Sequence, residues 1–326
     1  MSVQVELRQL RTHFPISRGR VVKAVDGIDL AIERGETFGL VGESGCGKST
    51  LGRTIKGIYK PTAGDVIFDG KNTARLTPSE ARAFARRVQM IFQDPYASLN
   101  PRMVVSEIIG EGLEIHKLGT RAERREKVRD IMGLVGLDPE YQNRFPHEFS
   151  GGQRQRIAIA RALIVDPEMV VCDEPISALD VSIQGQIVNL LKSLQERIGL
   201  TYLFVAHNLS MVKYISHRVG VMYLGRLVEL APKDELFSNP LHPYTQALLS
   251  SVPIPDPRLE AARVERAPEG ELPSPIETIE GCAFRSRCPF AQESCRGMRP
   301  VLTEAAPRHM VMCTLHGTPS AARATG

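Results

Sequence analysis

The chain has 326 residues, of which 42% are hydrophobic and 24% charged, and this composition predicts a folded protein with one large domain and a smaller appendage. Its net charge of +4 is mild, and it has no Lys/Arg run or aromatic-basic surface, so nothing favours a nucleic-acid partner. No apolar stretch approaches the roughly 18 residues that span a bilayer, and the N-terminus has no signal-like apolar core. We therefore expect a cytosolic chain, whose six cysteines are metal ligands or free thiols rather than disulfides.

The first 92 residues alternate between short strands and helices. Two strands are expected over residues 3–10 and 22–32, and a buried strand at 37–41 then leads into a glycine-rich loop. A helix, a strand with a turn, a second helix and a buried strand follow over residues 49–58, 66–70, 79–87 and 88–92. This alternation indicates an α/β fold around a mostly parallel sheet.

The loop after residue 41 reads Gly-Glu-Ser-Gly-Cys-Gly-Lys-Ser-Thr and has the spacing of a phosphate-binding loop. Its glycines let the backbone turn inward, so that successive N–H groups face phosphate oxygens. Lys48 brings a positive charge to the β- and γ-phosphates, and the Ser49 hydroxyl is the expected Mg²⁺ ligand. Cys46 is interpreted as a tolerated small residue. The predicted nucleotide-binding residues here are Gly42, Ser44, Gly45, Cys46, Gly47, Lys48, Ser49 and Thr50.

Residues 98–147 change character. Helical periodicity runs over 104–116 and 121–135 with no buried strand between, which predicts a helical insertion. The insertion ends at a Ser-Gly-Gly-Gln turn that opens another helix, and the N–H groups at a helix N-terminus bind anions. One chain does not need two phosphate cradles for one nucleotide, so the simplest geometry is a dimer in which each turn caps the partner's nucleotide. The residues of this turn are Ser150, Gly151, Gly152 and Gln153.

The alternation then resumes, and the first strand of this part, at residues 169–173, ends in two acids. Asp173 is expected to hold Mg²⁺, directly or through water, and Glu174 is the candidate general base for an attacking water. Adjacent acids can also cap a helix, but Pro175 forbids a helix that includes both. The next expected elements are a helix at 181–197, a strand at 201–206, a helix at 209–215 and a strand at 219–224.

This order of motifs resembles the ATPase subunits of ABC transporters, over residues from about 3 to 250. The resemblance implies a RecA-like, mostly parallel core sheet, an N-terminal antiparallel β subdomain and a helical insertion. It also implies in-line attack of water on the γ-phosphate of ATP, helped mainly by positioning and charge. Lys48, Glu174 and His207 are then the catalytic residues, and Ser49, Gln93 and Asp173 hold Mg²⁺.

The resemblance gives roles to residues that would otherwise be unremarkable. Gln93 links Mg²⁺ to the helical insertion, His207 is the switch histidine at the γ-phosphate, and Ser177–Asp180 is the loop that crosses to the partner subunit. Phe14 fits the family's aromatic residue that stacks on adenine. The alternatives are a core role for Phe14, a structural role for His207 and a helix N-cap at Asp180.

The composition shifts after residue 250. Six prolines between residues 252 and 281 predict a linker, and four of the six cysteines follow it. These cysteines suggest a metal site, although the C-x2-4-C pairs of structural zinc are absent. From the residues alone, zinc and an iron–sulfur cluster are about equal and unligated thiols come third, while His309 and His316 could replace a ligand. The cysteines are Cys282, Cys288, Cys295 and Cys313.

The C-terminal part carries the resemblance further. The segments at 239–245 and 281–289 look like the C-terminal extension of oligopeptide/dipeptide importer ATPases, and the phosphate loop resembles that of the second, F-like ATPase subunit. In this family the extension holds a [4Fe–4S] cluster, which the resemblance assigns to the four cysteines. The expected division is an ATPase domain at 1–251 with its helical subdomain at about 98–150, a linker at 252–281 and an iron–sulfur extension at 282–326. The linker leads us to expect an extension separate from the phosphate site.

The resemblance also implies partners and a location. We expect a second ATPase subunit in a heterodimer, two transmembrane permeases and an extracytoplasmic peptide-binding protein, with this chain peripheral on the cytoplasmic face of the membrane. The rivals are an importer ATPase for nickel, opines, glutathione or oligosaccharides, a soluble ABC ATPase of repair or translation, and an iron–sulfur electron carrier. The soluble class usually has coiled coils or two phosphate loops, and the complete hydrolytic set argues against the carrier.

Overall fold

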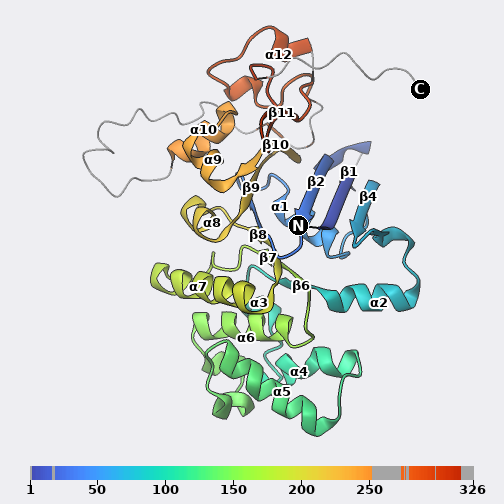
Figure 1. The fold of residues 1–326 in the computed structure, drawn as a ribbon, viewed down its shortest axis with the longest axis vertical. Coiled ribbons are helices and arrows are strands. Elements are labelled where there is room, and N and C mark those ends of the chain that lie inside the picture. Colours follow the sequence, from blue (N-terminus) through green and yellow to red (C-terminus); the bar gives the residue numbers. More distant parts are fainter. Residues whose placement is uncertain are drawn as a thin grey trace.

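The computed structural model describes residues 2–16, 19–251, 273–274, 276, 279–297 and 299–316. Two β-sheets organise this part of the chain (Figure 1). The smaller sheet is antiparallel, with strand order β2-β1-β4-β5. Its strands are β1 (Val3–Pro15), β2 (Val21–Glu33), β4 (Ala63–Phe68) and β5 (Lys71–Asn72).

The larger sheet has the order β11-β12-β10-β9-β3-β8-β7-β6. Its five strands from β9 to β6 run parallel, while β10, β12 and β11 pair antiparallel at one edge. The strands are β3 (Thr37–Val41), β6 (Val88–Ile91), β7 (Met169–Asp173), β8 (Thr201–Val205), β9 (Arg218–Tyr223), β10 (Arg226–Pro232), β11 (Thr303–Ala306) and β12 (His309–Val311).

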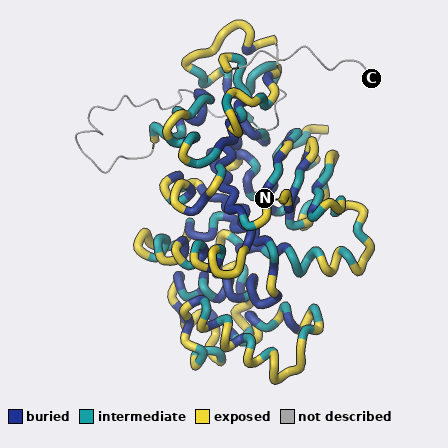
Figure 2. Tube along the Cα trace, in the orientation of Figure 1, coloured by how far each residue is buried: buried dark blue, intermediate teal, exposed yellow. Residues whose placement is uncertain are grey.

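The parallel strands are buried on both faces, as their nearly continuous apolar sequences predict. Alternate residues of β7 and β8 enter different hydrophobic clusters, because side chains alternate across a strand. Val170, Cys172, Tyr202 and Phe204 join a cluster with α6 (Gly151–Leu163), α7 (Val181–Ile198) and α8 (Leu209–Ile215). Val171, Leu203 and Val205 join the other cluster, with α1 (Lys48–Ile55) and the antiparallel sheet. Figure 2 shows this buried centre between exposed outer helices.

Most of the helices between β6 and β7 lie at the lower end of Figure 1, below α7. The helices between these two strands are α3 (Pro95–Ser98), α4 (Val105–Ile115), α5 (Arg121–Leu134) and the start of α6, with short 3-10 turns at Pro139–Asn143 and Pro146–Glu148. Helix α5 begins at a capping box, in which Thr120 and Glu123 satisfy each other's backbone N–H groups. The remaining helices are α2 (Pro78–Arg87), α9 (Lys233–Ser238), α10 (Pro243–Ser250), α12 (Ser294–Gly297) and the 3-10 turns Thr73–Arg75 and Arg285–Arg287.

The predicted α/β fold and its mostly parallel core are confirmed, as are the antiparallel β unit and the helical insertion. Most expected elements lie within a few residues of their predicted bounds. The C-terminal hairpin was not expected. Strand β12 pairs with β10, with Glu229 opposite Val311, so residues 303–311 extend the main sheet. Most of the predicted linker lies outside the described residues.

No helix among the residues that the structure describes is both long and apolar enough to cross a membrane.

Candidate functional site

The loop between β3 and α1 has the tight backbone that a phosphate cradle needs. Gly42, Gly45 and Gly47 all have positive φ. A Cβ at Gly42 would lie 2.1 Å from the carbonyl oxygen of Met222, and one at Gly47 would lie 1.9 Å from that of Ala24. Only glycine therefore fits at residues 42 and 47.

Lys48 lies inside this loop and is almost fully buried. Its Nζ donates to the carbonyl oxygens of Gly42, at 2.8 Å, and Glu43, at 2.9 Å. The Cys46 thiol is also buried, and burial raises its pKa, so it stays protonated and weakly nucleophilic at neutral pH. Lys48 is therefore the positive charge that this loop offers to an anion.

Ser49 lies in the first turn of α1, directly after this loop, and faces the end of β7. The Ser49 hydroxyl donates to Asp173 Oδ1 at 2.6 Å, and Asp173 is fully buried. Arg53 Nη2 approaches Asp173 Oδ2 at 3.5 Å. A hydroxyl and a carboxylate side by side are oxygen ligands of the kind that Mg²⁺ prefers. Two residues that are 124 apart in the sequence thus meet where parallel strands end.

Glu174 meets two other predicted residues at the same sheet edge. Gln93 Nε2 donates to Glu174 Oε2 at 3.0 Å, and His207 Nδ1 lies 3.6 Å from the same oxygen. Glu174 has a φ of +49°, an unfavourable conformation for a non-glycine residue, and its N–H donates to Val205 O. Strands β6, β7 and β8 thus deliver a glutamine, a carboxylate and an imidazole to one point.

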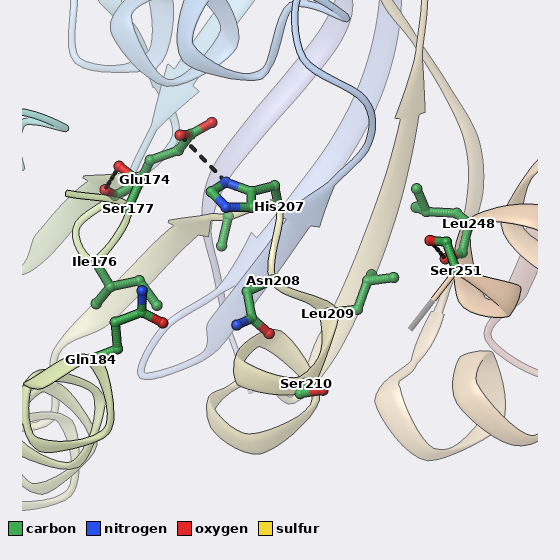
Figure 3. A pocket seen from close by; sticks show the side chains of 11 residues that line it. Glu174, Ile176, Ser177, Gln184, His207, Asn208, Leu209, Ser210, Leu248 and Ser251 are labelled. Atoms are coloured by element: carbon green, nitrogen blue, oxygen red, sulfur yellow. Dashed lines mark hydrogen bonds and ion pairs between the residues drawn. The ribbon is translucent and has the colours of Figure 1, made fainter. Parts of the chain in front are cut away.

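A cavity of about 470 Å³ opens beside Glu174 and His207 (Figure 3). Gln184 of α7, Asn208 and Ser210 of the α8 region, and the α10 end line its other sides. The His207 side chain is 63% exposed, whereas that of Glu174 is 16% exposed. The imidazole can therefore reach a ligand without first leaving a packed environment.

The Ser-Gly-Gly-Gln turn starts α6 as predicted. Ser150 Oγ accepts from the Gln153 N–H at 3.3 Å, and Gln153 Oε1 accepts from the Ser150 N–H at 2.9 Å. A Cβ at Gly152 would lie 2.5 Å from Ile183 Cγ2, so this glycine lets α6 approach α7. No hydrogen bond described here joins this turn to the phosphate loop, and Figure 1 shows α6 and α1 on different parts of the sheet.

For Asp180 and Phe14, the structure does not decide between the family role and the structural alternative. Asp180 stands at the N-cap position of α7, but its exposed carboxylate accepts no capping hydrogen bond. Phe14 is half-buried near the end of β1, and its ring contacts Tyr59 edge-on at 5.2 Å. Neither contact by itself assigns a ligand.

Two residues that the sequence analysis did not single out hold the phosphate loop. The Glu43 N–H donates to the Tyr244 hydroxyl at 2.8 Å, and the Glu43 carboxylate receives two hydrogen bonds from Arg287. The expected separation between the extension and the phosphate site is therefore wrong. No local signal could have revealed this contact, because Glu43 and Arg287 are 244 residues apart.

The four C-terminal thiols lie within electrostatic reach of one another. Burial, together with the charges of Cys295, Cys313 and Cys288, raises the pKa of Cys282 to about 11. Nevertheless, no three His, Cys, Asp or Glu side chains within the described ranges are grouped closely enough to hold a metal ion. The nearby His309 is turned elsewhere, because its Nε2 is 2.7 Å from the buried Glu229.

Comparison with known families identifies two regions of the chain. Residues 25–177 match the family described as "ABC transporter". Residues 228–295 match the family described as "Oligopeptide/dipeptide transporter, C-terminal region". The second match covers most of β10, all of α9 and α10, and three of the four cysteines.

The chain is also similar to curated proteins along nearly its whole length. It is 58% identical to the putative oligopeptide transport ATP-binding protein YkfD of Bacillus subtilis, over 96% of this chain and 95% of that one. It is 55% identical to the oligopeptide transport ATP-binding protein OppF of Escherichia coli, over 95% of this chain and 96% of that one.

Solved structures share the fold of the ATPase part. The dimeric ATP-binding cassette MJ0796, bound to ADP and phosphate, superposes with a TM-score of 0.64 at 29% identity, covering 70% of this chain and 98% of that one. For CbiO1 from Clostridium perfringens, the TM-score is 0.65 at 28% identity, with 73% and 92% covered. The long, highly identical matches decide the assignment: this chain belongs to the ABC-transporter family, among the oligopeptide transport ATP-binding proteins.

Proposed function

We propose that the protein is the ATP-hydrolysing subunit of an ABC importer for di- and oligopeptides. The observation that carries the chemistry is the meeting of Ser49, Asp173, Glu174, Gln93 and His207 at one sheet edge beside the phosphate loop. The peptide class rests on the relatives' names and on the C-terminal match. Other chains of the importer contact the peptide, so this chain supplies the driving reaction.

The site residues divide the work between binding and hydrolysis. The N–H groups of residues 42–50 and the Lys48 ammonium bind the phosphates, while Phe14 stacks on adenine. Ser49, Asp173 and Gln93 hold Mg²⁺, which neutralises phosphate charge when bound. Glu174 accepts the proton of the attacking water, and His207 contacts the γ-phosphate. The unfavourable backbone of Glu174 supports this role, because such strain is concentrated at functional sites.

The active unit is a dimer that shares two sites. The turn at Ser150–Gln153, in which Ser150 is exposed, lies apart from the phosphate loop of its own chain, so it acts on the ATP of the partner, and Asp180 crosses the interface. The partner is a second, non-identical ATPase. ATP binding closes the pair and hydrolysis reopens it.

The membrane partners bind the helical insertion. A groove of about 960 Å³ runs between α4 and α5 and is lined by Met103, Glu107, Ile115 and Arg124 among others. The Ile115 side chain is 60% exposed there. A groove of mixed apolar and charged character suits a short helix of a permease. Two permeases and an extracytoplasmic binding protein complete the importer, with this chain on the cytoplasmic face of the membrane.

We divide the chain into an ATPase domain at 1–251 that includes the helical subdomain at about 98–150, a linker at 252–281 and an extension at 282–326. The extension holds a [4Fe–4S] cluster on Cys282, Cys288, Cys295 and Cys313. The charges of Cys288, Cys295 and Cys313 all act on Cys282, and this proximity of the four thiols supports the cluster. In the described part of the chain, these side chains do not lie close enough together to form a set of metal ligands.

Reconstitution tests the function. The chain is assembled with its second ATPase, permeases and binding protein in vesicles, and uptake of labelled di- and oligopeptides is measured with ATP inside or outside. We expect peptide-stimulated hydrolysis and uptake that both need the complete assembly. A monomer that stays fully active on dilution contradicts the shared site, and uptake of nickel or an oligosaccharide but no peptide contradicts the substrate class.

Anaerobic purification tests the cluster. We expect brown protein with about four irons per chain. A Cys→Ser change at any of the four positions should bleach it, whereas Cys172→Ser, far from the extension in a buried strand, should not. Colourless protein with one zinc would place the site in the structural-zinc class, and four freely alkylated thiols would remove the metal.

A further inference from the structure

An ion pair joins the extension to the phosphate loop. Arg287 Nη1 donates to Glu43 Oε2 at 2.9 Å, and Nη2 donates to Oε1 at 3.0 Å. This parallel pair of bonds is the strongest geometry available to a guanidinium and a carboxylate. The Arg287 side chain is only 8% exposed and that of Glu43 is 23% exposed, so solvent screens the pair weakly.

The backbone N–H, the backbone carbonyl and the carboxylate of Glu43 all form hydrogen bonds. Its N–H donates to the buried Tyr244 hydroxyl, its carbonyl oxygen accepts from Lys48 Nζ, and its carboxylate binds Arg287. The lysine that is expected to meet the phosphates and the arginine of the extension therefore hold the same residue. A shift of Glu43 moves the loop that contains Lys48.

The turn that carries Arg287 is itself anchored in the core. The Arg287 N–H donates to the carbonyl oxygen of Phe284, whose side chain is fully buried. The Phe284 ring packs against Tyr223 and Tyr244, each at 5.4 Å between centroids. The turn that positions the Arg287 guanidinium against the loop is therefore held rigidly by the core.

The ion pair also affects the electrostatic potential of the phosphate loop. A phosphate loop works by offering positive potential to an anion, and a carboxylate within the loop opposes this. Arg287 binds both oxygens of that carboxylate. A guanidinium stays protonated at any physiological pH, so this compensating charge is always present.

We propose that Arg287 is a positioning residue of the nucleotide site, which neutralises Glu43 and holds the phosphate loop ready for the anionic phosphates. The cysteine extension is then a working part of the ATP site. This inference rests on the proposed function, because it takes ATP to be the ligand of the loop.

The test compares variants by the Kd of the full-length chain for Mg-ATP, Mg-ADP and AMP. Arg287→Gln leaves an unpaired carboxylate beside the phosphates, and we expect roughly tenfold weaker binding of ATP, with a smaller loss for AMP, whose charge is lower. Glu43→Gln with Arg287→Gln removes the carboxylate as well, so the double variant should bind ATP better than Arg287→Gln alone. In the assembled importer, Arg287→Gln should raise KM and change kcat less than twofold.

The matched control is Arg285→Gln, two residues earlier in the same turn, because the Arg285 side chain makes no hydrogen bond or ion pair in the described part of the chain. Should Arg287→Gln fail to fold, Arg287→Lys keeps the charge but loses the paired bonds, and a two- to fivefold loss is expected. The inference is overturned if the folded Arg287 variant binds ATP as tightly as wild type, or if the double variant is no better than the single one. A wild-type chain that binds no ATP overturns this inference and the proposed function together.

Discussion

The phosphate site and the C-terminal extension are built on opposite principles. At the phosphate site, short local patterns place each group: a glycine-rich loop after β3 and an acid pair after β7 reach the same sheet edge because parallel strands end there. In the extension, the decisive contacts join distant residues: Arg287 binds Glu43, and His309 binds Glu229. Short sequence motifs therefore place the groups of the phosphate site, while ion pairs between distant residues hold the extension against it.

The largest expected effect removes chemistry and spares structure. Glu174→Gln keeps the shape of the side chain and removes its basicity, so turnover by the assembled importer should fall roughly 10²–10⁴-fold while ATP binding persists. Steady-state hydrolysis and nucleotide binding are measured on the same preparation. A near-wild-type rate means that another residue is the general base.

The second change should lower the stability of the extension and leave the catalytic residues in place. His309→Ala leaves Glu229 fully buried with only the N–H groups of Leu241 and His242 as partners, which should cost about 3 kcal/mol of unfolding free energy. Urea unfolding gives the value. Glu235→Gln is the control, because its exposed carboxylate lies 3.7 Å from His309 Nδ1 and should matter by less than about 1 kcal/mol. Equal losses in both variants would show that burial of Glu229 does not decide the cost.

A pH titration should sharpen the same contrast. Burial lowers the pKa of His242 to about 3. The unfolded chain, with a His pKa near 6.5, therefore binds more protons between pH 3 and 6.5, so stability is lost as the pH falls through this window. Between pH 7 and 5 the loss should be about 2 kcal/mol. The variant His242→Asn can still accept from the Tyr244 N–H and should flatten this part of the curve; an unchanged slope would assign it to other groups.

The smallest effect concerns a purely local device. Ser150→Ala removes the hydroxyl that accepts from the Gln153 N–H, and should cost about 1 kcal/mol of unfolding free energy in the isolated chain. Hydrolysis by the importer should fall by much more than that loss explains, because we propose that the same hydroxyl faces the partner's ATP. Parallel losses of stability and activity would reduce Ser150 to a helix cap.

The same contrast explains what the sequence could predict. The buried strands β3 and β7 were placed to the residue, because their apolar runs end at a glycine-rich loop and at acids. The meeting of Gln93, Glu174 and His207 followed from the family resemblance and the parallel order. Strand β12 has only three residues and no periodicity to detect, and it is held by its partner β10 rather than by propensity. Arg287 could not be distinguished from its neighbouring arginines, because its role depends on where the fold brings Glu43.

The pairing of β12 with β10 has a consequence for biosynthesis. Glu229 leaves the ribosome 80 residues before His309, so the N-terminal part can assemble its parallel strands while the outer edge of β10 still has no neighbour. An unpaired edge is a site where nascent chains associate wrongly. Chains truncated before residue 303 should therefore aggregate during translation even though every strand of the phosphate site is complete.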